Sequence, residues 1–262
     1  MNVPTNGSPR SSKGLPVAAA GSPSSSGGSQ TAAMGSSGAA KGSPGVTDGL
    51  TIAVPRGALF GETVDLLSRL GLDTAELRSN DRKLLFEDIG VITMRPSDVP
   101  TYVESGAADI GITGKDVLLE QAAHGSDDPA RREVYELLDL GYGRCTMVLA
   151  SKAGPDPAAE ALRRLGVMRV ATKYPRIAER HMEQTGRQAE IVEVKGSVEL
   201  APLTGMVEAI VDLTATGTTL REHDLIVREE IVVCTAWLIA NPVSHKLRAQ
   251  EIDRMLERLR GV

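Results

Sequence analysis

Aromatic residues, basic excess and long apolar runs are all scarce in this chain. Aromatics make up 3% of its 262 residues, so a surface that stacks nucleic-acid bases is not expected. The net charge of -5 offers no basic excess to attract nucleic acid or anionic lipid. No apolar run approaches the roughly 20 residues that a membrane-spanning helix needs. The composition therefore favours a globular protein that binds neither nucleic acid nor membrane, with a core of Val, Ile, Leu and Ala.

Cysteine is also rare, and the two cysteines and four histidines form no pattern typical of a disulfide framework or a zinc site. Cys145 and Cys234 lie far apart in apolar stretches, where a small buried side chain is the common role. The histidines do not recur at metal-ligand spacing. We therefore expect no disulfide, no metal held directly by the protein, and a reducing, cytoplasmic compartment.

Acidic residues are absent from the first 47 positions, which are dominated by Ser, Gly, Ala and Pro. Such a composition cannot repay the entropy cost of ordering, and we predict that residues 1–48 form a disordered low-complexity tail. A Ser-rich leader without acids is also typical of an organelle transit peptide, although Arg and an amphipathic stretch are nearly missing here.

From Leu50 onward, short apolar strands alternate with amphipathic helices. This alternation is typical of parallel sheets covered by helices on both faces. Two groups of such units, followed by a strand over 231–239 and a helix over 245–259, predict an α/β protein of two lobes. We place lobe I at residues 49–146 and 225–262, and lobe II at 147–224. The cleft between the lobes is the expected active site, because ligands in such folds bind at the carboxyl ends of strands.

The most informative segment runs from Asp212 to Leu220, directly after a buried strand. It places a carboxylate beside a hydroxyl-rich loop that opens a helix, and free N–H groups at a helix start favour a phosphate. We expect this loop to hold a phosphorylated sugar through Thr214, Ala215, Thr216, Gly217, Thr218 and Thr219. The alternative is an ordinary strand–turn–helix in which threonines cap the helix.

Charged side chains occur at other predicted strand ends. Arg56 and the Arg82-Lys83 pair fit phosphate binding, with a solvated turn arginine as the alternative for Arg56. The glycine-rich turn 111–116 contains Lys115. The turn 141–144 contains Arg144, and a hinge is the alternative role for this turn. Glu199 brings a second carboxylate shortly before Asp212, with a dipole or capping role at a helix start as the alternative.

Taken in order, these turns resemble the short form of ATP phosphoribosyltransferase over about residues 49–262. The similarity is carried by segments 52–57, 82–84, 97–103, 108–117, 140–145, 171–175, 196–202 and 212–220. The resemblance implies two α/β lobes similar to the type II fold of periplasmic binding proteins. It also implies the first step of histidine biosynthesis, in which the phosphoribosyl group of 5-phosphoribosyl 1-diphosphate moves to N1 of ATP and diphosphate leaves. Magnesium is required and is carried by the substrate phosphates.

The resemblance also implies roles for individual residues. The loop 214–219 holds the 5-phosphate in this family, while Glu199 and Asp212 flank the ribose and stabilise positive charge at the anomeric carbon. Arg82, Glu199 and Asp212 are the expected catalytic residues. The expected phosphate-binding cations are Arg56, Arg82, Lys83, Lys115 and Arg144.

Two departures from the family pattern stand beside the first predicted strand. Many members carry Lys where this chain has Arg56, and an arginine where it has Ala58. Either Arg56 or Arg144 then takes over the contact with nucleotide phosphate, or ATP lies slightly differently.

The resemblance finally implies partners. Short-form members pair with a regulatory subunit related to histidyl-tRNA synthetase in a hetero-octamer, and self-association as a dimer is expected. The apolar stripe of the last predicted helix fits that interface or the core of its own lobe. Two other classes stay open: a two-lobed binding protein without catalysis, and a degenerate structural subunit. The sugar-phosphate loop with its paired carboxylates favours the enzyme.

Overall fold

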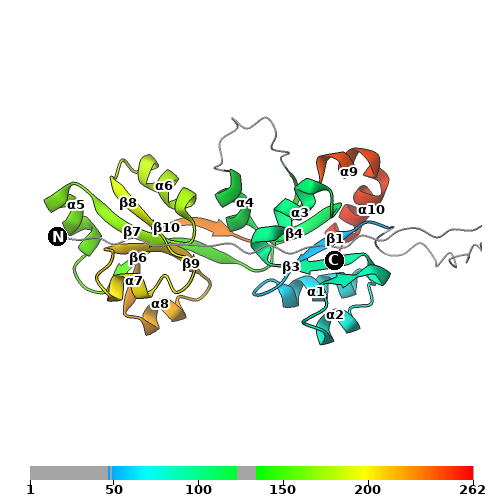
Figure 1. Cartoon of the computed structure of the whole chain (residues 1–262), viewed down its shortest axis with the longest axis horizontal. Coiled ribbons are helices and arrows are strands. Elements are labelled where there is room, and N and C mark those ends of the chain that lie inside the picture. Colours follow the sequence, from blue (N-terminus) through cyan, green and yellow to red (C-terminus); the bar gives the residue numbers. More distant parts are fainter. Residues whose placement is uncertain (1–46, 48, 123–133, 262) are drawn as a thin grey trace, which may run out of the picture. The chain divides into compact units, whose positions relative to one another are not determined.

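The computed structural model describes residues 47, 49–122 and 134–261. Residues 1–46 and 48 of the predicted tail lie outside this range. The described residues contain two mixed sheets, whose strands Figure 1 labels. Among them, no helix has the length and apolar character needed to cross a bilayer.

The first sheet has six strands in the order β2-β3-β1-β4-β11-β5. Parallel pairing joins β1 (Ile52–Pro55) to β3 (Val91–Met94) and to β4 (Ile110–Gly114). Antiparallel pairing adds β2 (Leu85–Phe86) at one edge, and β11 (Ala236–Ala240) with β5 (Tyr135–Asp139) at the other.

Helices pack against this sheet through two separate hydrophobic clusters. Val64 and Leu67 of α1 (Phe60–Arg69) pack with Ile252 and Met255 of α10 (Ala249–Arg260) in the larger cluster. A second cluster contains α3 (Val99–Ser105) and α4 (Lys115–Ala122). A Cβ at Gly111 would lie 2.7 Å from methyl groups of Val99 and Val103, so glycine is what lets α3 approach β4.

The second sheet has five strands in the order β10-β6-β9-β7-β8. Its strands are β6 (Cys145–Lys152), β7 (Met168–Thr172), β8 (Ala189–Glu193), β9 (Ala209–Thr214) and β10 (Leu225–Cys234). One apolar cluster contains α5 (Pro157–Leu165) and α6 (Pro175–Gln184), and another contains α7 (Leu200–Leu203) and α8 (Thr218–Glu222). The remaining helices are α2 (Ala75–Ser79) and α9 (Pro242–Leu247), with 3-10 turns at Glu87–Ile89 and Pro96–Asp98.

The prediction of parallel sheets was wrong in part, because β6 pairs antiparallel with both β9 and β10. The single strand expected at 231–239 is two strands that separate at Thr235 and belong to different sheets. Residues 225–230 of β10 were missed because Arg228, Glu229 and Glu230 interrupt the apolar pattern, as charged residues often do in an edge strand. Residues 225–234 were therefore assigned to lobe I, whereas β10 pairs with β6 of the second sheet.

Two helix predictions also differ from the structure. The expected helix over 245–259 is divided at Arg248 into α9 and α10. The sequence also predicts a helix that Ser97 caps and that runs to about Ser105, but Ser97 does not cap α3, since its hydroxyl donates to Asp98 and a 3-10 turn precedes the helix.

The chain passes twice between the sheets, through residues 140–144 and through Thr235. The two crossovers bind each other, because Ala236 N donates to Tyr142 O at 2.9 Å and Leu140 N donates to Ala236 O at 2.9 Å. Residues of both sheets line one cavity beside this junction.

Candidate active site

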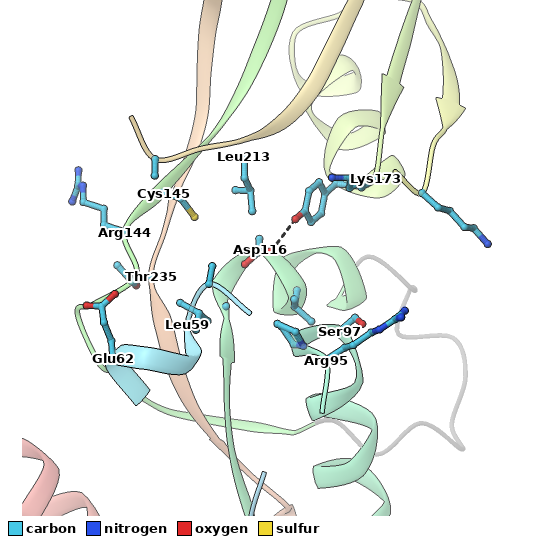
Figure 2. Close-up of a pocket in the computed structure, with 18 of the residues that line it drawn as sticks. Leu59, Glu62, Arg95, Ser97, Asp116, Arg144, Cys145, Lys173, Leu213 and Thr235 are labelled. Atoms are coloured by element: carbon cyan, nitrogen blue, oxygen red, sulfur yellow. Dashed lines mark hydrogen bonds between the residues drawn. The ribbon is translucent and has the colours of Figure 1, made fainter. Parts of the chain in front are cut away.

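A cavity of about 1020 Å³ is lined by residues from both sheets and from their connecting segments (Figure 2). The wall near β1 and β4 includes Leu59, Glu62 and Asp116, and the wall near β7 and β9 includes Tyr174 and Leu213. The cavity lies where several strands end at their carboxyl side, as expected for a ligand site in an α/β fold.

Four cationic side chains lie on the cavity wall, together with the carboxylates of Glu62, Asp116 and Glu193. Arg95 follows β3, Lys173 follows β7, and Lys195 lies two residues beyond β8. Arg144 joins them from the first crossover. Within the described residues, none of the four makes a side-chain hydrogen bond or ion pair. Their charges are therefore available to a polyanionic ligand such as a diphosphate.

Arg144 is the only one of these four cations that the sequence analysis named. The others were missed, although each stands at or just beyond the end of a strand. A cation at the end of a strand was the available signal. It identified Arg56 and Lys115, but the cations after β3, β7 and β8 were not considered.

Asp116 and Tyr174 meet in the cavity. The Tyr174 hydroxyl donates to Asp116 Oδ2 at 3.2 Å (Figure 2). Burial raises the pKa of Asp116, with the hydrogen bond from Tyr174 acting in the opposite direction. Burial and the nearby Asp116 charge also raise the pKa of Tyr174, so its phenol stays protonated and acts as a donor.

A second contact joins α4, which contains Asp116, to the start of α6, which follows Tyr174. The carboxylate of Glu120 in α4 accepts hydrogen bonds from the backbone N–H groups of Arg176 and Ile177, each at 3.1 Å. These groups belong to the first turn of α6, where N–H groups lack partners within the helix. Glu120 therefore caps α6 and holds the adjacent Lys173-Tyr174 segment beside the cavity.

The two predicted ribose-binding carboxylates influence each other electrostatically. Burial raises the pKa of Asp212, while Lys173 lowers it and Glu199 raises it further. Asp212 Oδ1 accepts a hydrogen bond from Leu213 N at 2.9 Å. Glu199 makes no side-chain capping bond to α7, so the structure gives no support to the capping alternative. Neither carboxylate lines the cavity itself, but Leu213 and Ala215 on either side of β9's end do.

The threonine loop after β9 has a fixed shape. Gly217 has φ of 71°, in the left-handed region that favours glycine. Its N–H donates to Thr214 Oγ1 at 2.9 Å, and the hydroxyls of Thr216 and Thr218 lie 2.9 Å apart. Thr219 is exposed in the first turn of α8. The loop therefore presents hydroxyls and N–H groups on a compact turn that begins at the cavity wall.

Arg221 braces this loop and was missed by the sequence analysis. Its guanidinium donates to Thr216 O and to Thr218 Oγ1, both at 3.1 Å. The signal was its position one turn into α8, where a long side chain reaches back over the preceding turn.

The remaining predicted cations do not line the cavity. Arg56 donates to the carbonyls of Asn80 and Lys83 at 3.2 and 3.1 Å, and lies over the Phe60 ring at 4.4 Å. Lys83 pairs with Glu76, and Lys115 pairs with Glu136 over the ring of Trp237. Arg82 is exposed and outside the cavity wall. The structure thus brings Arg144 and Ala215 to the cavity wall and places the other predicted residues outside it.

Metal-ligating side chains do not cluster in the part of the chain that the structure describes: it holds no group of three or more His, Cys, Asp or Glu residues suited to a metal ion.

Comparison with known proteins identifies the family. The family model of HisG, ATP phosphoribosyltransferase, matches residues 95–261. An ATP phosphoribosyltransferase of Rubrobacter xylanophilus is 53% identical over 211 residues, covering 79% of this chain and 94% of that protein. One from Sorangium cellulosum is 45% identical over 220 residues, covering 82% of this chain and 97% of that protein.

Solved structures agree on the fold. The ATP phosphoribosyl transferase (HisG:HisZ) complex from Thermotoga maritima matches with a TM-score of 0.65 and 33% identity, over 81% of this chain and 97% of that chain. The aliphatic sulphonate binding protein SsuA of Escherichia coli matches with a TM-score of 0.51 at 15% identity, over 80% of this chain and 70% of that chain. At that identity SsuA shares the fold alone, so the expected resemblance to periplasmic binding proteins is confirmed while their binding function is not carried over.

A family match over most of the chain, relatives of high identity and a neighbouring structure of the same kind all agree with the resemblance expected from the turns. The chain belongs to the ATP phosphoribosyltransferase (HisG) family, which catalyses the first step of histidine biosynthesis.

Proposed function

We propose that the cavity is the site where 5-phosphoribosyl 1-diphosphate and ATP react. The observation that carries this proposal is the convergence of Arg95, Arg144, Lys173 and Lys195 on one cavity whose wall continues into the threonine loop. Two substrates with several phosphates each need such a concentration of uncommitted positive charge.

The phosphoribosyl group fits the side formed by β9. The loop 214–219 offers hydroxyls and N–H groups to the 5-phosphate, and Glu199 and Asp212 accept hydrogen bonds from the ribose hydroxyls. During transfer the bond from the anomeric carbon to the diphosphate oxygen breaks, and the bond to adenine N1 forms. Positive charge develops on the sugar, and the carboxylates of Asp212 and Glu199 stabilise it. Lys173 counters the burial that raises the pKa of Asp212, and so favours its ionised form.

The phosphates of ATP and the departing diphosphate fit the cationic wall. Arg144 shares that wall with Ala58, where many family members carry an arginine, whereas Arg56 is occupied by backbone carbonyls. This placement supports Arg144 as the residue that takes over the nucleotide contact. Adenine N1 already carries a lone pair, so no strong general base is required.

Magnesium fits as an ion carried by the substrate phosphates rather than by a dedicated protein cluster. Bound to diphosphate, it would neutralise part of the charge on the leaving group. Asp212, which lies just before the loop in sequence, and Glu199 would contribute through water or ribose oxygens.

We also propose a regulatory partner. The Thermotoga maritima structure, which this chain matches at 33% identity, is a HisG:HisZ complex. A subunit resembling histidyl-tRNA synthetase would assemble with dimers of this chain into a hetero-octamer in the cytoplasm, and histidine would act through that subunit.

An ultraviolet assay of phosphoribosyl-ATP formation tests these proposals. ATP, 5-phosphoribosyl 1-diphosphate and magnesium are supplied with and without the partner subunit, and then with histidine or excess chelator. Product that depends on magnesium and on the partner, and that decreases with histidine, is the expected result. Full activity of the isolated chain without histidine inhibition would contradict the partner proposal, and full activity in chelator would contradict the role of magnesium.

A further inference from the structure

Cys145 and Cys234 are far apart in sequence but lie directly opposite each other in the structure. Cys145 begins β6 and Cys234 ends β10, and the antiparallel register pairs the two residues. Both thiols are free. Residues opposite each other in an antiparallel pair point to the same face of the sheet.

This register suits a covalent bond between the two sulfurs. Opposed residues of antiparallel strands have Cα atoms about 4.5–5.5 Å apart. A disulfide requires a Cα separation of roughly 4.4–6.8 Å. The thiols therefore need side-chain rotation and a small local adjustment to bond, without any change of strand pairing.

The pair is also placed where a bond would matter. Cys145 directly follows the first crossover, and Cys234 directly precedes the second crossover at Thr235. Both lie next to the hydrogen bonds that join Ala236 to Tyr142 and Leu140. Cys145 and Thr235 both line the cavity, beside Arg144. A bond between the cysteines would fix the spacing of the two crossovers at the cavity wall.

Access differs between the two thiols. Cys145 is half-buried and faces the cavity, whereas Cys234 is 1% exposed. A small oxidant that enters the cavity reaches Cys145 first, and Cys234 is then positioned to displace the oxygen from the oxidised sulfur.

We propose that Cys145 and Cys234 form a redox-sensitive site, in which a peroxide oxidises the pair to a disulfide that restrains the crossovers and slows turnover. Hydrogen peroxide converts the Cys145 thiol to a sulfenic acid and is reduced to water. The Cys234 thiol then attacks that sulfur, forming the disulfide and releasing a second water. Reduction by an added dithiol reverses the change. The site goes beyond the transfer reaction, and its formation does not depend on the substrate assignments above.

The surroundings set the rate of this oxidation. Burial raises the pKa of Cys145, and it raises the pKa of Cys234 to about 12, with the Asp116 carboxylate acting in the same direction on both. Because the thiolate is the reactive form, oxidation is slow near neutral pH and accelerates as the pH rises.

The test is to treat the full chain with hydrogen peroxide and count thiols after denaturation. We expect both thiols to be lost, the mass to decrease by two hydrogen atoms, and a non-reducing peptide map to contain a linked pair bearing Cys145 and Cys234. Activity, measured with the regulatory subunit present if turnover requires it, is expected to decrease and to return with dithiothreitol.

The variants Cys234→Ala and Cys145→Ala are the controls, with thermal melting to confirm that each is folded. Cys234→Ala is expected to keep its activity and to lose the inhibition that dithiothreitol reverses. The proposal is overturned if the wild-type thiols stay free, or if Cys145 is oxidised to sulfinic acid without a linked peptide. An intact linkage with unchanged turnover would overturn its effect on the cavity. Since thiol counting needs no substrate, failure here and failure of the proposed function are distinguishable.

Discussion

The cations beside β1 and β4 differ from those on the cavity wall in what they contact. Arg56, Lys83 and Lys115 all end in carboxylates or backbone carbonyls of this chain. Lys173 and Lys195 end in the cavity without a hydrogen bond or ion pair to any described residue. Arg56 and Lys115 follow strands, as Lys173 and Lys195 do, so position at a strand end alone does not separate the two groups.

We infer that a cation at a strand end is available to a ligand only when the protein leaves its donors unused. Arg56 uses its guanidinium to hold the segment 80–83 against the end of β1. Its donors would have to leave those carbonyls before they reached a phosphate, at the cost of unsatisfied buried groups. Lys173 has no such commitment and already acts on Asp212.

The largest expected effect comes from removing a carboxylate that we propose to flank the ribose. We expect Asp212→Ala to lower kcat by roughly 10²–10³, because a group that stabilises the charged transition state is lost. The matched change in the internally paired group is Glu76→Gln, which removes the partner of Lys83. That variant is expected to keep its kcat. Full activity of Asp212→Ala in the phosphoribosyl-ATP assay would remove the ribose role from Asp212.

Removing a cation separates the two groups directly. We expect Lys173→Met or Lys195→Met to raise the KM of a phosphate-bearing substrate by about 10- to 100-fold, as a charge-assisted contact of roughly 1.5–3 kcal/mol would give. Melting temperatures are expected to stay unchanged. Lys83→Met is the control and should leave both KM values as they are. Equal effects of Lys83 and Lys173 on KM would break the distinction drawn from their contacts.

A stability effect is expected from the other side of the comparison. Arg56→Met removes the donors to Asn80 and Lys83 and should lower the free energy of unfolding by about 1–3 kcal/mol. Urea denaturation measures this change. Arg82→Met, in the same segment but with an exposed side chain, is the control and should unfold as the wild type does. An unchanged midpoint for Arg56→Met combined with a large rise in KM would return Arg56 to the substrate site.

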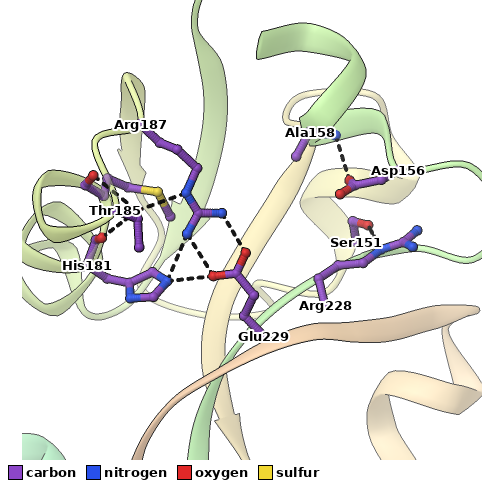
Figure 3. Close-up of polar contacts among 9 residues, drawn as sticks. Ser151, Asp156, Ala158, His181, Thr185, Arg187, Arg228 and Glu229 are labelled. Carbon is purple, nitrogen blue, oxygen red and sulfur yellow. Dashed lines mark hydrogen bonds and ion pairs between the residues drawn. The ribbon is translucent and has the colours of Figure 1, made fainter. Parts of the chain in front are cut away.

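The smallest effect concerns a carboxylate that, unlike Asp212, is fully committed within the protein. Glu229 of β10 accepts hydrogen bonds from Arg187 at 2.7 Å and pairs with His181 at 2.9 Å (Figure 3). The hydrogen bonds from Arg187 lower the pKa of Glu229 below its ordinary value of 4.5, with burial acting in the opposite direction. The stability from this network is therefore complete above about that pH and is lost as the pH decreases through the lowered pKa.

Urea denaturation at a series of pH values measures this contribution. Arg187→Gln is expected to flatten the acid side of the stability curve, and the difference from wild type should be small and sensitive to salt, because the Glu229 side chain is 39% exposed. Asp212, whose pKa is raised by burial, should show the opposite sign: Asp212→Asn removes a destabilising charge above that pKa. Identical acid slopes for wild type and Arg187→Gln would exclude Glu229 as the source.

Much of the fold was predictable because local patterns and tertiary packing agree. The sequence predicts helices at 157–165 and 175–185 and strands at 169–172 and 209–213, and α5, α6, β7 and β9 lie there. The elements that were missed or merged, β5, β10 and β11, carry mixed polarity or break at a single residue. Their pairing partners lie far away in sequence, and strand pairing of that range is decided by the sheet rather than by local preference.

The order of the turns determined the family, and the Asp212-to-Leu220 segment determined where a sugar phosphate is expected, because glycine and hydroxyl side chains at a strand end carry their chemistry locally. The tertiary structure decided which cations are free and that Cys145 faces Cys234. Both depend on contacts between residues distant in sequence. A guanidinium can hold a carbonyl of its own chain or a phosphate, and only packing settles which donors stay unused.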